Sequence, residues 1–265
     1  MHAFHYHRPS SAKDAVSLAS KNGEGKYLAG GQSLVQAMKL RLSSPSDLFD
    51  LNFLKELSGI KASGSTVEIG AMTRHADVAG SAEVKQAIPA LAALAGMIGD
   101  RQVRHMGTIG GSLANNDPAA DYPAVALALG ATITTNKRKI EADKFFTGLY
   151  ETALEPGELI TSVSFPAPKR AAYMKFKNPA SRFAIVGVFV ADFGGKVRVG
   201  VTGAGPSVFR QAEMEKALSA KFAPESVANI KVKADGLNND LHASPEYRAH
   251  LVTIMAKRAV EAALK

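Results

Sequence analysis

Two pairs of adjacent glycines, each closely followed by a serine, are the residues in this chain of 265 best suited to hold a charged ligand. The pair at 30–31 is followed by Ser33, and the pair at 110–111 by Ser112. A glycine has no Cβ, so a ligand can approach its backbone closely and its φ can become positive. Where a glycine turn leads into a helix, free amide N–H groups and the helix dipole both favour an anion. Each pair is therefore a candidate phosphate site.

The first pair lies in a strand–turn–helix pattern. Residues 26–28 are typical of the end of a short strand, and Leu34, Ala37 and Met38 recur at the spacing of one helix face. An ordinary turn, with Ser33 capping the helix, explains this stretch as well as a phosphate site does. The second pair favours the phosphate site, because two such turns could hold one diphosphate from two sides.

Thr108 and Ser112 add hydroxyl donors around the second pair, and Asp121 follows it. In dinucleotide sites a carboxylate beyond the glycine turn accepts hydrogen bonds from a ribose. The two stretches together resemble the FAD-binding medium subunit of the molybdenum hydroxylases, a family that includes carbon monoxide dehydrogenase and the xanthine dehydrogenases. The resemblance extends over essentially the whole chain and is carried by Ala29-Gly30-Gly31-Gln32-Ser33-Leu34, Thr108-Ile109-Gly110-Gly111-Ser112 and Asp117-Pro118-Ala119-Ala120-Asp121.

The resemblance implies an α+β fold: a two-part FAD-binding domain of the vanillyl-alcohol-oxidase/PCMH type, then a C-terminal three-stranded antiparallel sheet with helices. The residue pattern agrees, since Gly194-Gly195 is typical of a hairpin turn between strands. Strands are predicted over 171–177, 183–193 and 196–202, and helices over 208–220, 224–230 and 245–264. We expect FAD-binding subdomains at 1–55 and 56–168, and a C-terminal flavoprotein domain at 171–265.

The resemblance also implies which residues hold FAD. The two glycine motifs would wrap its diphosphate, and Asp121 would bind the adenosine ribose. Ile160 would pack on the adenine or the flavin, and Lys177 would lie near the isoalloxazine. The expected cofactor-binding residues are Leu28, Ala29, Gly30, Gly31, Gln32, Ser33, Leu34, Thr108, Ile109, Gly110, Gly111, Ser112, Asp121, Ile160, Lys177 and Phe183. No catalytic and no metal-binding residue is expected.

Two positions depart from the family pattern. Phe183 stands where the carbon monoxide dehydrogenase relatives have a tyrosine over the flavin, so its ring can stack but cannot donate a hydrogen bond. Gln32 stands where those relatives have a histidine. Because glutamine cannot form the histidyl link found in some oxidases of the wider superfamily, the FAD should be bound noncovalently.

The chain contains no cysteine, and cysteine thiolates are the usual ligands of iron–sulfur clusters. The resemblance therefore implies an FAD-carrying electron-transfer subunit, with the 2Fe-2S clusters and the molybdenum cofactor on partner chains. Electrons would arrive from a 2Fe-2S small subunit and leave to NAD, a quinone or another acceptor. A molybdenum-cofactor large subunit would complete a heterotrimer or a dimer of heterotrimers.

Two other functions remain open. One is a stand-alone FAD-dependent oxidoreductase of the same superfamily. The other is a non-catalytic binding module that uses a basic sheet, because the net charge is +8 and residues 166–205 hold seven basic residues against Asp192 alone. Few aromatic residues and no recognition motif accompany these charges, so we do not expect nucleic-acid binding.

Hydropathy and the N-terminal residues bear on location. No apolar run approaches the length of a membrane-spanning helix, and the N-terminus lacks the basic-then-apolar layout of a signal peptide. We therefore expect a cytoplasmic protein without a membrane span. His2, His5 and His7 alternate near the N-terminus, but without acidic or cysteine companions they are typical of a surface strand rather than a metal site.

Overall fold

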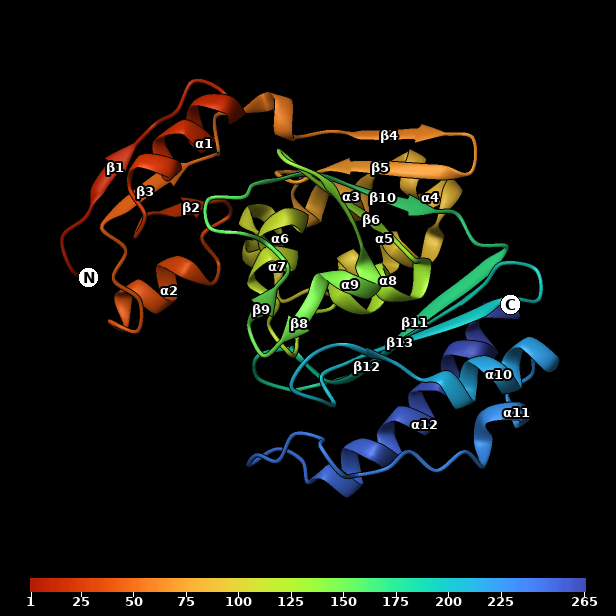
Figure 1. The fold of residues 1–265 in the computed structure, drawn as a ribbon. Helices are drawn as coiled ribbons and strands as arrows, with labels where there is room; N and C mark the ends of the chain where they lie inside the picture. The colour runs from red at the N-terminus through yellow and green to blue at the C-terminus, as the bar shows by residue number, and fades with distance from the viewer.

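The computed structural model describes residues 1–265, and its elements follow one another as three sheet-based parts (Figure 1). The N-terminal part is a parallel sheet of order β1-β3-β2, in which β3 is central and buried along its whole length. Its elements are β1 (His5–His7), α1 (Ala12–Lys21), β2 (Lys26–Leu28), α2 (Leu34–Lys39) and β3 (Asp47–Asp50). Because β2 and β3 are parallel, the turns that follow them meet at one edge of this sheet.

The central part is an antiparallel sheet of order β4-β5-β10-β6-β7. Its strands are β4 (Ile60–Ser63), β5 (Thr66–Gly70), β6 (Thr132–Thr135), β7 (Lys139–Glu141) and β10 (Ile160–Pro166). Six helices lie between β5 and β6 in the chain: α3 (His75–Gly80), α4 (Ala82–Ala87), α5 (Pro89–Gly96), α6 (Arg101–Met106), α7 (Ile109–Asn115) and α8 (Tyr122–Leu129). Smaller elements are η1 (Lys55–Leu57), α9 (Ala142–Phe145), β8 (Phe146–Gly148) and β9 (Glu151–Thr152).

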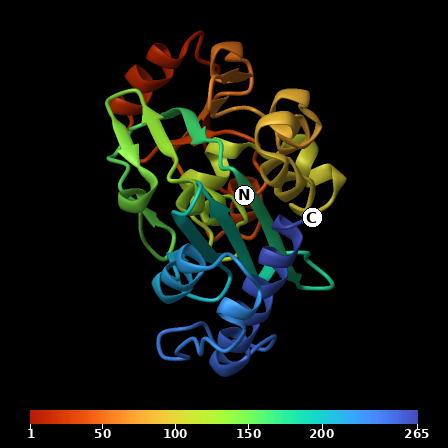
Figure 2. The ribbon, with the colours of Figure 1, turned by 90° about the vertical axis from the view of Figure 1, so that its right-hand side faces the viewer.

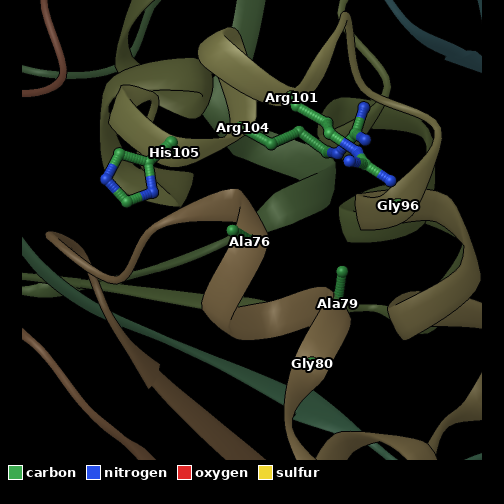
Figure 3. A pocket seen from close by; sticks show the side chains of 7 residues that line it. All are labelled: Ala76, Ala79, Gly80, Gly96, Arg101, Arg104 and His105. Atoms are coloured by element: carbon green, nitrogen blue, oxygen red, sulfur yellow. The ribbon is translucent and has the colours of Figure 1, made fainter.

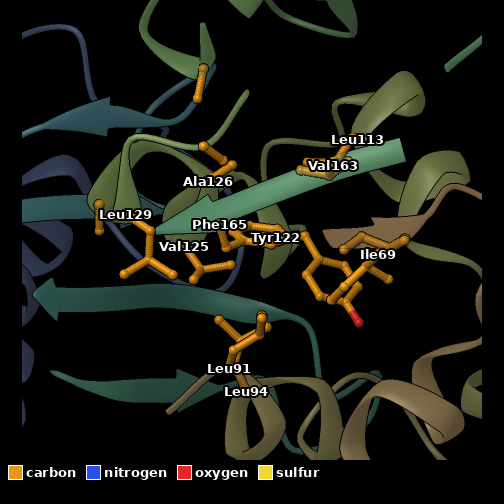
Figure 4. Close-up of a cluster of buried hydrophobic side chains, with 14 of the residues drawn as sticks. Ile69, Leu91, Leu94, Leu113, Tyr122, Val125, Ala126, Leu129, Val163 and Phe165 are labelled. Atoms are coloured by element: carbon orange, nitrogen blue, oxygen red, sulfur yellow. The ribbon is translucent and has the colours of Figure 1, made fainter. Parts of the chain in front are cut away.

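Helix α8 is the middle of the main core. Every one of its residues is buried, and the segment is apolar on all sides, as a helix covered all round requires. Figure 4 shows Val125 and Leu129 of this helix among side chains from β10 and α5. On the other side, Gly200 of the C-terminal sheet lies so close to Ala124 that a Cβ there would collide with its backbone.

The C-terminal part is a sheet of order β11-β12-β13-β14 with helices packed on it. Its elements are β11 (Arg170–Lys177), β12 (Ala184–Asp192), β13 (Val197–Thr202), β14 (Phe209–Arg210), α10 (Ala212–Ala220), α11 (Glu225–Ala228) and α12 (Pro245–Ala263). The central strand β12 is buried at every position, which explains why its sequence is apolar up to the final Asp192, whose carboxylate pairs with Arg170. In both ribbon views the helices α10–α12 lie at the end of the molecule away from α1 (Figures 1 and 2).

The predicted α+β class is confirmed. The predicted number of strands in the C-terminal sheet is wrong. That sheet has four strands rather than three, because Phe209 and Arg210 pair with β13. The helix expected from position 208 consequently begins only at Ala212. The sheets of the first two parts fall within 1–55 and 56–168, whereas the C-terminal sheet begins at Arg170, one residue before the expected 171. These domain boundaries stay a prediction. No helix combines the length and the apolar character needed to cross a membrane.

Candidate functional site

The two glycine motifs, far apart in sequence, lie against each other. A Cβ added to Gly30 would come within 2.6 Å of the Cα of Gly107, one residue before the second motif. A Cβ added to Gly111 would lie 3.4 Å from the Cβ of Ala29. The turn after β2 and the start of α7 therefore form one continuous surface, to which the N-terminal and the central parts both contribute.

The first turn offers free hydrogen-bond donors. The backbone amides at 30–33 have no acceptor within the chain, and Ser33 does not cap α2 with its side chain. Gly31 has a φ of 72°, a left-handed conformation that glycine adopts without strain. Successive amides around such a residue form a concave nest that binds anions. This geometry fits a diphosphate and does not fit the alternative of an ordinary serine-capped turn.

The second turn differs from the first, because its amides at 109–111 already have acceptors. The Ile109 and Gly110 amides donate to the carbonyl oxygens of Thr73 and Ala71, at 3.1 and 2.8 Å, and the Gly111 amide donates to Thr108 Oγ1 at 3.2 Å. Gly110 must be a glycine, since a Cβ there would lie 2.6 Å from that of Ala71. The second glycine pair thus permits close packing of α7, and the free donors beside it are the Thr108 amide and the Ser112 hydroxyl.

Two residues that the sequence reasoning missed connect the turns. Asn52 Nδ2 donates to the Ala29 carbonyl at 2.9 Å, and Arg74 Nη2 donates to Asn52 Oδ1 at 2.8 Å. Arg74 Nη1 donates to the carbonyl of Met106, and the Arg74 backbone pairs with that of Thr108. Asn52 could have been predicted from its place just after β3, beside the first turn. Arg74 could not, because its partners become neighbours only in the folded chain.

Asp121 is buried rather than open to a ligand. Its Oδ1 accepts from the Tyr173 hydroxyl at 2.5 Å, and its Oδ2 accepts from Lys175 Nζ at 2.9 Å. Burial raises the pKa of the Asp121 carboxyl, against the opposing effects of Lys175 and Tyr173. Both oxygens therefore already have partners in the contact between α8 and β11. Ile160 is likewise buried, within the central core, so its side chain packs on protein. Their roles towards FAD stay predictions.

Lys177 and Phe183 lie together where β11 turns into β12. Lys177 pairs with Ala184, and the Asn178 amide donates to the Phe183 carbonyl at 2.8 Å. Arg182 takes a positive φ of 63° in this turn, and the Phe183 ring is 52% exposed. An exposed aromatic ring of this kind is available to stack on a flat ligand.

A hollow of about 460 Å³ lies between α3 and α6, beside the second turn. Figure 3 shows the Arg101 and Arg104 side chains extending towards Gly96, while the His105 ring lies apart from them. Arg104 Nη1 donates to the carbonyl oxygens of Ile98 and Gly99, at 3.0 and 3.1 Å. These contacts make Arg104 a structural residue that holds the loop before α6.

His75 lies beneath the second turn as a neutral side chain. It is 5% exposed, and its ring packs 5.3 Å from that of Tyr122. Burial, together with the charges of Arg104 and Arg74, lowers the pKa of His75 to about 4. The His75 ring is also so close to Gly107 that a Cβ there would collide with it. An uncharged ring thus supports the backbone at the start of the second motif.

Comparison with known proteins agrees with this site. Residues 2–168 match the family described as the FAD binding domain in molybdopterin dehydrogenase. The chain is 36% identical to the carbon monoxide dehydrogenase medium chain of Hydrogenophaga pseudoflava, covering 98% of this chain and 96% of the relative. It is 35% identical to the glyceraldehyde dehydrogenase medium chain of Sulfolobus acidocaldarius, covering 97% and 96%.

A solved structure gives the same result for the fold. Reconstituted CO dehydrogenase from Oligotropha carboxidovorans contains a chain that superposes with a TM-score of 0.92 and 35% identity. The match covers 99% of this chain and 98% of that one. The likeness therefore includes the C-terminal sheet and helices as well as the part that the family model matches.

Proposed function

Because the chain belongs to the family of FAD-binding domains of molybdopterin dehydrogenases, we propose that it is the FAD-carrying electron-transfer subunit of a molybdenum hydroxylase. It is an oxidoreductase subunit. The observation that carries the proposal is the nest of unpaired amides at 30–33, which lies directly against the start of the second glycine motif. This is the surface that a dinucleotide's diphosphate requires.

The partners and the electron route are part of this proposal. The relatives are named as medium chains of carbon monoxide and glyceraldehyde dehydrogenases. Since this chain has no cysteine, the 2Fe-2S clusters belong on a small subunit. Membership of the molybdopterin dehydrogenase family supports a large subunit that carries the molybdenum cofactor. Electrons pass from the small subunit to this chain and on to NAD, a quinone or another acceptor. The assembly is a heterotrimer or a dimer of heterotrimers.

When bound, FAD accepts electrons one at a time or in pairs and passes them on; the protein supplies position and electrostatics. The amides at 30–33 hold the diphosphate, with the Ser112 hydroxyl as a further donor. Gln32 carries no ring nitrogen that could attack the flavin, so binding is noncovalent. Phe183, exposed at its turn, offers a ring face without a hydrogen-bond donor. Lys177, which pairs with Ala184, adds a positively charged residue to the same turn.

A visible absorption spectrum tests this function. The purified chain, incubated with FAD and then passed through a desalting column, should keep the two absorption bands of a flavin. A protein that stays colourless after this treatment would contradict the proposal. When the chain is combined with its large and small partner subunits, addition of the substrate of the molybdenum centre should reduce the flavin.

The same experiment separates the alternatives. A stand-alone oxidoreductase would reduce its flavin with substrate in the absence of any partner. A basic binding module has less support, because the structure pairs three of the cations of residues 166–205 within the chain. Arg170 lies 2.8 Å from Asp192, Lys175 lies 2.9 Å from Asp121, and Arg198 lies 2.7 Å from Asp143.

A further inference from the structure

Arg74 lies between the two glycine motifs. We infer that its guanidinium is a positioning residue for both turns and also a direct charge partner of the FAD diphosphate. The inference rests on the proposed function and adds to it a residue outside both motifs. Four observations carry it. They are the hydrogen bonds of Arg74, the position of Gly30 against the Met106 carbonyl to which Arg74 donates, the lack of an ion pair, and the partial exposure of the side chain.

The hydrogen bonds place the guanidinium where the two turns meet. Arg74 Nη2 reaches the first turn through Asn52, at 2.8 Å, and Asn52 in turn donates to the Ala29 carbonyl at 2.9 Å. Arg74 Nη1 reaches the residue before Gly107 by donating to the Met106 carbonyl. One planar group thus contacts the second side directly and the first side through Asn52.

The Met106 carbonyl fixes how close the guanidinium lies to the free amides. A Cβ on Gly30 would collide with this same carbonyl oxygen, so Gly30 and Arg74 Nη1 approach one atom from two directions. The unpaired amides begin at Gly30. The positive charge of Arg74 therefore lies next to the nest, where a bound diphosphate would carry its negative charge.

The guanidinium has no counterion. Arg74 takes part in none of the ion pairs of the chain, and its three acceptors, the Met106 carbonyl, the Met106 sulfur and Asn52 Oδ1, are all neutral. A guanidinium carries five N–H donors, so N–H groups remain free after these contacts. The residue is partly exposed, which leaves room for a ligand to reach it. An unneutralised guanidinium with free donors binds phosphate strongly.

Asn52 and its neighbours hold the guanidinium in place. Asp50 Oδ1 accepts from the Asn52 amide and side chain, at 2.9 and 2.6 Å, and Asp50 Oδ2 accepts from the Tyr6 hydroxyl at 2.5 Å. These contacts orient the Asn52 amide so that its oxygen faces Arg74 and its nitrogen faces Ala29. The charge is therefore pre-positioned before any ligand arrives.

The test is equilibrium FAD binding by the full chain at several salt concentrations. Arg74→Gln removes the charge, Arg74→Lys keeps the charge but cannot hold both acceptors in one plane, and Lys61→Gln removes one exposed charge from β4 as a control. We expect Arg74→Gln to weaken FAD binding about tenfold or more and to flatten its dependence on salt. Arg74→Lys should weaken binding but keep the salt dependence, and Lys61→Gln should resemble the wild type.

Two results would overturn the inference. In the first, Arg74→Gln binds FAD as tightly as the wild type. In the second, it binds FAD more weakly but with the salt dependence of the wild type, which would show that Arg74 only positions the turns and does not contact the diphosphate. Thermal unfolding of the FAD-free variants shows whether they fold. If Arg74→Gln does not fold, a folded Arg74→Lys that binds FAD as tightly as the wild type would overturn the positioning role. If the wild type itself fails to bind FAD, the proposed function is wrong, whatever Arg74 does.

Discussion

At the scale of single residues, Gly30 and Gly31 are needed for different physical reasons. Gly31 has a positive φ, which a side chain with a Cβ adopts only at a cost of about 1–2 kcal/mol. Gly30 has no such requirement, but its Cα lies against the backbone of Met106 and Gly107. Backbone atoms cannot move aside as a flexible side chain can. A side chain at position 30 would therefore push the two turns apart.

Replacing Gly30 by alanine should therefore separate the turns. We expect Gly30→Ala to destabilise the fold by about 1–3 kcal/mol through overpacking, and to weaken FAD binding at least about tenfold. Gly23→Ala is the matched control, because a Cβ there meets nothing within 4 Å. Urea denaturation and FAD titration check both effects; equal FAD affinity in the two variants would show that the contact between the turns is not needed for binding.

His75 should make the stability of the apoprotein depend on pH. Burial, aided by Arg104 and Arg74, lowers its folded-state pKa to about 4, while the unfolded value is about 6.5. The unfolded state binds the proton more readily, so the stabilisation is complete above about pH 6.5 and is lost as the pH falls towards 4. The total loss is about 3 kcal/mol.

Urea denaturation between pH 7 and pH 4 measures this loss. The variant His75→Gln has no titrating side chain at this position, so its free energy of unfolding should fall less with pH than that of the wild type. Parallel pH curves for the two proteins would contradict the assignment of a neutral, buried His75.

Sequence reasoning identified the first turn correctly as a place where amides are free, because its glycines follow directly from a short strand. It could not tell that the amides at 109–111 in the second turn already have acceptors. Two of these acceptors, the carbonyls of Ala71 and Thr73, belong to a connection distant in sequence. In the same way, the burial of Asp121 depends on a strand that begins about fifty residues later in the chain. The FAD contacts of the individual residues remain predictions.

At the scale of elements, patterns of hydrophobicity predicted which strands and helices exist better than where each one begins and ends. The strands at 171–177, 183–193 and 196–202 correspond to β11, β12 and β13, since long apolar or alternating runs are strong signals. Strand β14 was missed because a two-residue pairing leaves no periodicity to detect. The apolar run from Tyr122 forms α8, and the sequence alone could not show that this helix separates two sheets.

The contact between α8 and β11 should be the strongest polar link between the central and C-terminal parts. The Asp121 and Lys175 side chains are only 3% and 2% exposed, so either one alone would be a buried, unpaired charge. We expect Asp121→Asn and Lys175→Met each to destabilise the fold by about 3 kcal/mol, and the double variant by clearly less than the sum. Urea denaturation of the four proteins measures the coupling; strictly additive effects would contradict this contact.

At the scale of the whole molecule, composition gave a misleading view of charge. The excess of basic residues at 166–205 suggests an open basic face, yet Arg170, Lys175 and Arg198 are bound to carboxylates inside the chain. The sequence cannot show this, because the partner acids Asp121 and Asp143 belong to the central part. The basic charge that matters for the proposed function is instead Arg74, which comes from a region of balanced composition.

The central claim is that two turns, remote in sequence, form one site for the diphosphate of FAD. Isothermal titration of the FAD-free chain, with ADP and adenosine as competitors, tests it most directly. The account predicts one FAD bound per chain, displaced by ADP, which carries the diphosphate, and far less by adenosine, which does not. Binding of FAD that ADP fails to weaken, or no binding at all, would contradict it.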